Sequence, residues 1–180
     1  STPAHAGGDL TLGGPNQIAS IGGLSAGQNL LYRQVGDLSV PTISAAGTVS
    51  LYSTTGDISQ TGAITADTLT LGAGGDITLG ENFVSRLGRI DAGGSFSAVQ
   101  GLGLSSGALE LTDDITVGGS MVLVNHGAIT QTGGAITAAN LFLDTDGVLT
   151  LTGADSISGY TSLARQDGTF NAVGGLHIRV

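Results

Sequence analysis

The phrase Ile58-Ser59-Gln60-Thr61-Gly62-Ala63-Ile64-Thr65-Ala66 occurs twice in this chain. It returns, with one inserted Gly, as Ile129-Thr130-Gln131-Thr132-Gly133-Gly134-Ala135-Ile136-Thr137-Ala138. A second phrase, Gly8-Asp9-Leu10-Thr11-Leu12-Gly13, returns as Gly75-Asp76-Ile77-Thr78-Leu79-Gly80 and loosely as Gly147-Val148-Leu149-Thr150-Leu151-Thr152. Internal repeats of this kind are the sequence signature of stacked, solenoid-like architectures.

The spacing of these copies sets the expected size of one coil. From Asp9 to Asp76, and again from Asp76 to Val148, the chain advances by roughly 70 residues, which is too long for a single coil. Division of each unit into three gives rungs of about 24 residues. We place the rung starts near Asp9, Asp37, Asp57, Asp76, Leu102, Ala128, Val148 and Leu176.

Within a rung, apolar and polar residues alternate, as in Leu69-Thr70-Leu71 and Leu109-Glu110-Leu111. This pattern predicts short strands with one face inside. Gly, Asn, Asp and Ser between the strands predict turns, in part because they accept positive φ. No capped segment with helical periodicity is evident.

A rung this short cannot bury its apolar face alone, so neighbouring rungs must cover it. We expect Ile18, Val84 and Ile157 to share one inward column, and Ile21, Leu87 and Tyr160 another. Small inward residues at Ala26, Ala66, Ala92 and Ala138 would keep the coil narrow. The prediction is all-β: a single-stranded right-handed parallel β-helix (β-solenoid) of about seven rungs, forming one domain over residues 1–180.

Composition narrows the functional classes. The 180 residues include 32 Gly, no Cys and no Trp, with five basic against fourteen acidic residues and a net charge of −9. Nucleic acid and anionic membranes should be repelled by such a chain. The absence of Cys excludes disulfides and thiolate metal sites, and no apolar run is long enough for a spanning helix. We therefore expect no nucleic-acid partner, no membrane insertion and no cofactor.

The motifs Gly56-Asp57-Ile58-Ser59-Gln60 and Ala63-Ile64-Thr65-Ala66-Asp67-Thr68-Leu69 resemble the repeat region of bacterial exoproteins of the filamentous haemagglutinin type, which are exported by two-partner secretion. The resemblance runs from Gly8 to Val180. The amino-terminal secretion domain of that family and a toxin or catalytic domain are not seen in this sequence.

The resemblance implies a piece of an adhesive stalk, secreted or held at the bacterial surface, with roles in virulence or biofilm formation. Its partners would be a surface receptor or glycan on host or bacterial cells, and an outer-membrane transporter for the parent protein. No catalytic residues carry over, so an enzyme is not expected. A carbohydrate-active β-helix enzyme and an ice- or surface-binding solenoid remain the alternatives.

Several residues are candidates for a binding site. Arg86 and Arg89 could grip a carboxylate or sulfate, or they could form salt bridges with Glu81 or Asp91. The longer expected rungs contain Arg86 to Gly94 and Ser162 to Thr169, where loops or extra strands would create a contact site. The candidate ligand-binding residues are Arg86, Arg89, Asp91 and Arg165.

Other motifs favour structural roles over metal binding. The segment from Gly72 to Leu79 approximates one calcium nonapeptide, but that mechanism needs tandem copies. Asp144-Thr145-Asp146-Gly147 begins like a calcium loop without its later Glu, and Asp113-Asp114 suggests a turn. His5, His126 and His177 show no ligand spacing. No metal site is predicted.

The end of the sequence, Leu176-His177-Ile178-Arg179-Val180, predicts the first strand of an eighth rung. We therefore expect a fragment of a longer solenoid, or end-to-end self-association, because a bare solenoid end exposes its core and unpaired backbone groups.

Overall fold

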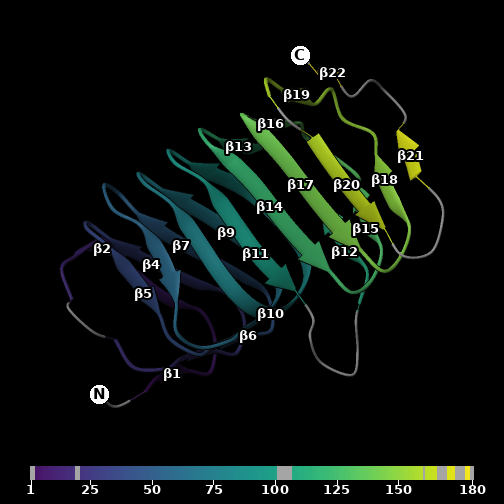
Figure 1. The fold of residues 1–180 in the computed structure, drawn as a ribbon. Helices are drawn as coiled ribbons and strands as arrows, with labels where there is room; N and C mark the ends of the chain where they lie inside the picture. The colour runs from purple at the N-terminus through teal and green to yellow at the C-terminus, as the bar shows by residue number, and fades with distance from the viewer. Residues whose placement is uncertain are drawn as a thin grey trace.

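The computed structural model describes residues 3–18, 21–100, 107–159, 161–165, 170–172 and 177–178. In this part of the chain all regular structure is β-strand, and the strand pairings are parallel. The strands wind into a stack of coils that advances from the N-terminal to the C-terminal end (Figure 1). No helix that could cross a membrane is present among these residues. The expected β-solenoid is confirmed.

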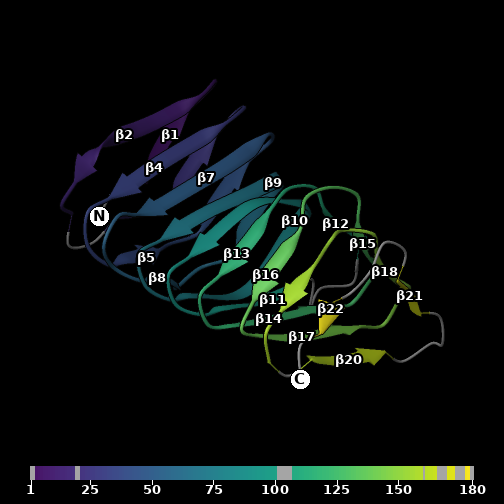
Figure 2. The same ribbon diagram turned by 90° about the horizontal axis from the view of Figure 1, so that it is seen from above.

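Up to β10, the strands form three columns along the stack. Column I consists of β1 (Ala4–Ala6), β3 (Leu24–Ala26), β6 (Ile43–Ala45), the start of β9 (Ile64–Ala73) and the middle of β10 (Ile77–Ala92). Column II consists of β2 (Leu10–Asn16), β4 (Leu30–Gln34), β7 (Thr48–Ser53) and the ends of β9 and β10. Figure 2 shows β2, β4, β7 and β9 side by side.

Column III runs from β5 to β20 and so extends past β10. It contains β5 (Leu38–Val40), β8 (Ile58–Gln60), the start of β10, β11 (Phe96–Gln100), β14 (Ser120–Asn125), β17 (Asn140–Thr145) and β20 (Thr161–Arg165). After β10, column II continues as two columns of shorter strands. One contains β12 (Leu109–Leu111), β15 (Ile129–Gln131), β18 (Leu149–Leu151) and β21 (Phe170–Ala172). The other contains β13 (Ile115–Val117), β16 (Ile136–Ala138), β19 (Ser156–Ile157) and β22 (His177–Ile178).

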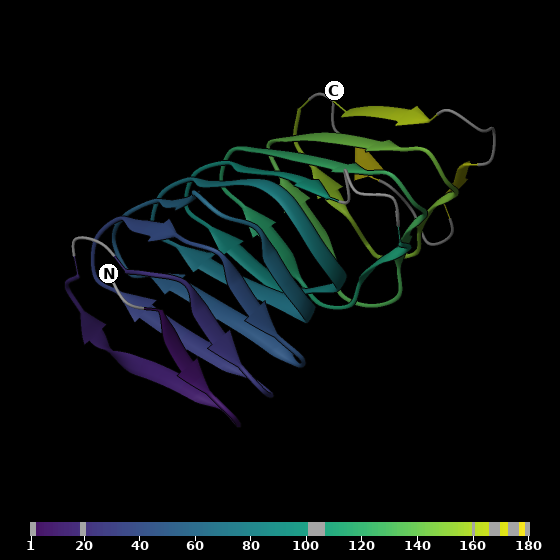
Figure 3. The same cartoon turned by 90° about the horizontal axis from the view of Figure 1, so that it is seen from below.

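One coil takes about 20 residues, which is shorter than the sequence spacing predicts. Leu30 pairs with Val49, and Val49 pairs with Leu69, so the chain returns to the same column once per coil of this length. The coil that follows β10 is longer. Thr112, which donates to the carbonyl of Leu87 in the preceding coil, lies 25 residues further along the chain. The stack has about seven turns, which Figure 3 shows in succession.

The core is a set of apolar columns along the axis. In column III, Ile58, Ile77, Phe96, Met121 and Leu141 stack on one another and are at most 1% exposed. Burial of one such side chain stabilises the fold by roughly 1.5–3 kcal/mol. The inward small residues were correctly predicted at Ala26, Ala66, Ala92 and Ala138, all of which are buried.

The two expected columns of homologous residues are not present. Val84 is buried, but Ile18 is 43% exposed, and Val84 pairs with Ala66 in the neighbouring coil. Leu87 is buried and Ile21 is half-buried, while Tyr160 lies outside the described residues.

The cause is a mismatch between the sequence repeat and the coil. Leu10, at the start of the first copy, lies three full turns before Leu69, and the second copy begins only at Ile77, in the next column. Successive copies of the phrase therefore fall in different columns. Asp9 precedes β2 in column II and Asp76 precedes β10 in column III, whereas Val148 precedes β18, whose column continues column II through β12 and β15.

Most turns do not use left-handed backbone conformations. Among the described residues no non-Gly residue has positive φ, and Gly134 is the Gly that does, at φ 65°. Gly134 belongs to the Gly pair that lengthens the second copy of the first repeat phrase. In the described ranges, bends lie between the strands where Gly, Asn, Asp and Ser predicted turns, and the chain uses positive φ, one of the two ways in which these residues make turns, at Gly134.

Candidate functional site

Aspartates at one corner of the coil form a ladder along the axis. The Oδ1 atom of Asp37 accepts a hydrogen bond from the backbone N–H of Asp57 at 3.1 Å, and Asp57 accepts one from Asp76 at 2.8 Å. Asp76 in turn accepts one from Ser95 at 2.7 Å. Each side chain thus satisfies a backbone donor of the following rung, where the strand hydrogen bonds are interrupted.

The glycines before Asp57 and Asp76 leave room for this contact. A Cβ on Gly56 would overlap the Asp37 carboxylate, and a Cβ on Gly75 would overlap that of Asp57. The Gly-Asp phrase is therefore a packing unit between rungs. In the segment from Gly72 to Leu79, Asp76 holds a backbone amide, which supports the structural interpretation of this calcium-like motif.

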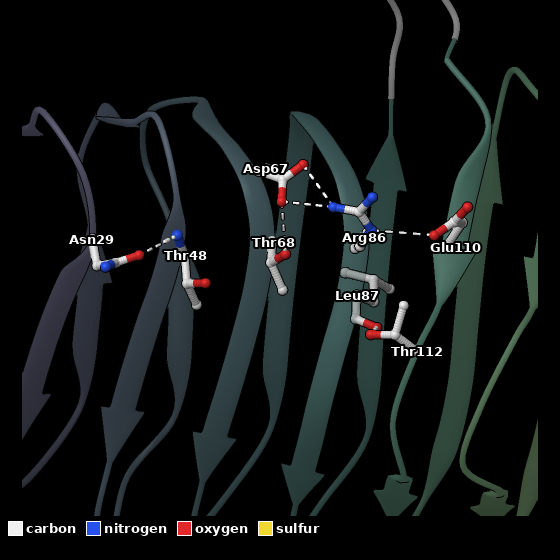
Figure 4. Close-up of polar contacts among 8 residues, drawn as sticks. All are labelled: Asn29, Thr48, Asp67, Thr68, Arg86, Leu87, Glu110 and Thr112. Atoms are coloured by element: carbon white, nitrogen blue, oxygen red, sulfur yellow. Dashed lines mark hydrogen bonds and ion pairs between the residues drawn. The ribbon is translucent and has the colours of Figure 1, made fainter.

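Arg86 connects three successive rungs on the outer face of column II. Its Nη1 atom lies 3.0 and 2.7 Å from the two carboxylate oxygens of Asp67, and its Nε donates to Glu110 at 3.2 Å (Figure 4). The hydrogen bond to Glu110, followed by the negative charges of Asp67 and Glu110, raises the pKa of the Arg86 guanidinium. The predicted partners, Glu81 and Asp91, were wrong for this residue. With two carboxylates in place, Arg86 acts as a brace between rungs.

Arg89 has the partner that was predicted for it. Its Nη2 lies 3.1 Å from Oδ2 of Asp91, and both side chains are more than half exposed. The surrounding segment, Arg86 to Gly94, was expected to form a loop or an extra strand, and up to Ala92 it belongs to the continuous strand β10. The long coil instead follows β10, between Ile90 and Ile115.

A shallow groove lies beside Arg89 on the outer face of column II. It has a volume of about 330 Å³, and its lining includes Arg33, Tyr52, Gly72, Arg89 and Asp91. The guanidinium carbon of Arg33 lies 5.4 Å from the centre of the Tyr52 ring. Sequence reasoning missed Arg33 and Tyr52. The coil period could have revealed them, because Arg33 pairs with Tyr52, Tyr52 with Gly72 and Gly72 with Asp91.

The other candidate residues have separate positions or partners. Arg165 ends β20 and its backbone pairs with Thr145, while its side chain lies outside the described residues, as do Gln166 to Thr169. Asp114 accepts a hydrogen bond from Ala135 N–H at 3.0 Å, in the turn that was predicted there. His126 Nδ1 lies 2.8 Å from Asp146 Oδ2. Within the described ranges, no three His, Cys, Asp or Glu residues are grouped to hold a metal ion.

Comparison with known proteins supports the repeat architecture. Residues 27–86 match a family model described as repeats of unknown function (DUF5649). The matched stretch is a third of the chain and spans about three coils. A search of curated proteins gives no match. A search of solved structures gives none either. The fold and the family match together define a β-solenoid repeat protein.

Proposed function

We propose that this chain is a structural and adhesive stalk segment of a large bacterial exoprotein of the filamentous haemagglutinin type. In this proposal the parent protein is exported by an outer-membrane two-partner transporter and is secreted or held at the cell surface. The solenoid supplies a rigid rod, and its outer face and loops attach to a receptor or glycan on a cell surface.

The observation that carries the proposal is the use of acidic side chains to join rungs. Asp9, Asp37, Asp57, Asp76 and Asp114 each accept a backbone hydrogen bond from the following coil. Hydrogen bonds of this kind between successive coils favour a regular rod, which a stalk requires. A carbohydrate-active enzyme, the alternative, would need acids and bases that converge on one substrate bond.

A bead-adhesion assay tests the proposal. Beads coated with the chain should be retained on bacterial or epithelial cells, and soluble chain should compete for the same sites. Beads coated with Val84→Asp, which is expected to disrupt the coil, provide the control. Equal retention of both beads, or release of unsaturated or reducing sugar ends from a panel of acidic polysaccharides, would contradict an adhesive, non-enzymatic role.

A further inference from the structure

We propose that the column II groove is a binding site for a carboxylated sugar ring, with Tyr52 as its stacking platform and Arg33 and Arg89 as its carboxylate and hydroxyl donors. This inference extends the proposed adhesive function, on which it rests, by naming a site and a ligand class. The groove is built on four neighbouring strands, β4, β7, β9 and β10, whose register is fixed by backbone pairing.

Tyr52 is positioned by the absence of a side chain on the next rung. A Cβ at Gly72 would lie 2.8 and 3.2 Å from ring carbons Cδ1 and Cε1 of Tyr52. The Cδ1–Cε1 edge of the ring therefore leans over Gly72, and the partly exposed Tyr52 side chain lines the groove. A partly exposed aromatic ring offers an apolar contact area with a polar hydroxyl at its edge, which suits the mixed surface of a pyranose ring.

Arg89 reaches the groove because the strand carries an irregularity at this point. Leu87 pairs with Leu69 and Ile90 pairs with Leu71, so one extra residue of β10 lies opposite the strand β9. Such bulges redirect side chains and are common beside binding sites. The bulge places the Arg89–Asp91 pair next to Tyr52, where Arg89 can donate hydrogen bonds and Asp91 can accept them.

Arg33 supplies the charge that selects an anion. Among the described residues it forms no ion pair, and its guanidinium faces the Tyr52 ring. The groove thus carries two Arg and one Asp on a protein of net charge −9. The planar guanidinium matches a single carboxylate in a bidentate geometry, whereas a polyanion would be repelled by the rest of the surface.

The dimensions of the groove limit the ligand to a small unit. Its volume of about 330 Å³ is at the lower end of the range for small-ligand sites, ~300–1,000 Å³. An open groove of this size fits one terminal or internal sugar ring of a longer glycan. Binding of the isolated ring should be weak, in the millimolar range, because few groups contact it.

The test is a two-dimensional NMR titration of the whole chain with methyl glucuronide, methyl glucoside and inorganic sulfate. We expect shifts confined to amides of β4, β7, β9 and the end of β10, with the glucuronide binding about tenfold more tightly than the neutral glucoside. Arg33→Gln should remove this preference. Tyr52→Leu should weaken both sugars, and Gly72→Ala should do the same by displacing the ring without removing it.

Ser39→Asp is the matched charge control, because it makes the net charge more negative by one, as Arg33→Gln does, but lies on column III. Loss of binding in this variant would mean that overall charge, not the groove, holds the ligand. Absence of shifts in the groove, or equal affinity for sulfate and glucuronide, would also overturn the inference. If beads still adhere to cells while glucuronide does not bind, the site is wrong and the adhesive function stands. Glucuronide binding without adhesion would support the site and contradict the adhesive function.

Discussion

The carboxylate of Asp155 accepts a hydrogen bond from Gln131 Nε2, one coil earlier, at 2.8 Å. The same arrangement joins Gln60 to Asn82, whose Oδ1 accepts from Gln60 Nε2 at 2.9 Å. The two sites differ in the second polar atom of the side chain, Nδ2 in Asn82 and Oδ2 in Asp155. Asn82 Nδ2 donates to Gln60 Oε1 and to the carbonyl of Gly80, whereas Asp155 Oδ2 is buried and has no hydrogen-bond partner among the described residues.

We therefore predict that Asp155→Asn stabilises the protein. The amide would place a donor where a buried acceptor now has no partner, and such an unsatisfied group costs about 1–3 kcal/mol. A gain of about 1 kcal/mol would raise Tm by roughly 2–4 °C in a chain of this size. The reciprocal change, Asn82→Asp, should lower Tm, as thermal unfolding followed by circular dichroism can show. A lower Tm for Asp155→Asn would contradict the equivalence of the two positions.

Gly75→Ala should destabilise the coil by about 2 kcal/mol, because its Cβ would overlap the Asp57 carboxylate in the ladder. Gly36→Ala is the matched control. Gly36 also precedes an aspartate, but nothing lies within 4 Å of its Cβ position. Urea unfolding should place Gly36→Ala close to wild type and Gly75→Ala well below it. Equal effects on stability would show that the two glycines are needed for their backbone conformation and not to make room for a carboxylate.

Val84→Asp should destabilise the protein by roughly 4 kcal/mol or more, because it places an unpaired charge against Ala66 in the core. Ser85→Asp, on the exposed side of the same strand, should change stability little. The two free energies of unfolding can be compared by denaturant titration. If Ser85→Asp were the more damaging change, the register of β10 would be shifted by one residue.

Tyr32 should make stability depend on pH in the alkaline range. Burial raises the pKa of Tyr32 above its ordinary value of 10.0, because the neutral phenol is favoured in the core, where it donates to Gln34 Oε1 at 2.8 Å. Its stabilising contribution is complete below pH 10.0 and is lost as the pH rises through the raised pKa. Tm should fall less steeply above that pH in Tyr32→Phe than in wild type. If Tm fell equally steeply with pH in both proteins, Tyr32 would not be the cause of the alkaline loss of stability.

Calcium should not change the melting temperature. The carboxylates of the Gly-Asp corner are occupied by backbone amides, and a folded-state ligand would stabilise by mass action. Unfolding curves with calcium and with chelator should coincide. A clear rise with calcium would reveal a site formed by these aspartates.

The fold could be predicted from the sequence because each rung carries its own signal. Alternation in Leu69-Thr70-Leu71 identifies the inward face, and the recurring Gly-Asp phrase marks the corners. The column partners could not be predicted from homologous phrases, because successive copies are not separated by a whole number of turns. Ile18 is exposed, for example, whereas its counterpart Val84 is buried. The groove was missed because Arg33, Tyr52 and Asp91 become neighbours through the true coil period, which the longer rung estimate obscured.

Two of the three repeat copies lie on one side of the rod and the copy between them lies on another. The copies that begin at Gly8 and Gly147 lead into β2 and β18, which belong to one run of paired strands, whereas the copy that begins at Gly75 leads into column III. A surface feature copied with the repeat would therefore appear on two sides of the rod. Such a rod could meet a flat surface with either side. Duplication of the unit would then add contacts to both sides rather than along one edge.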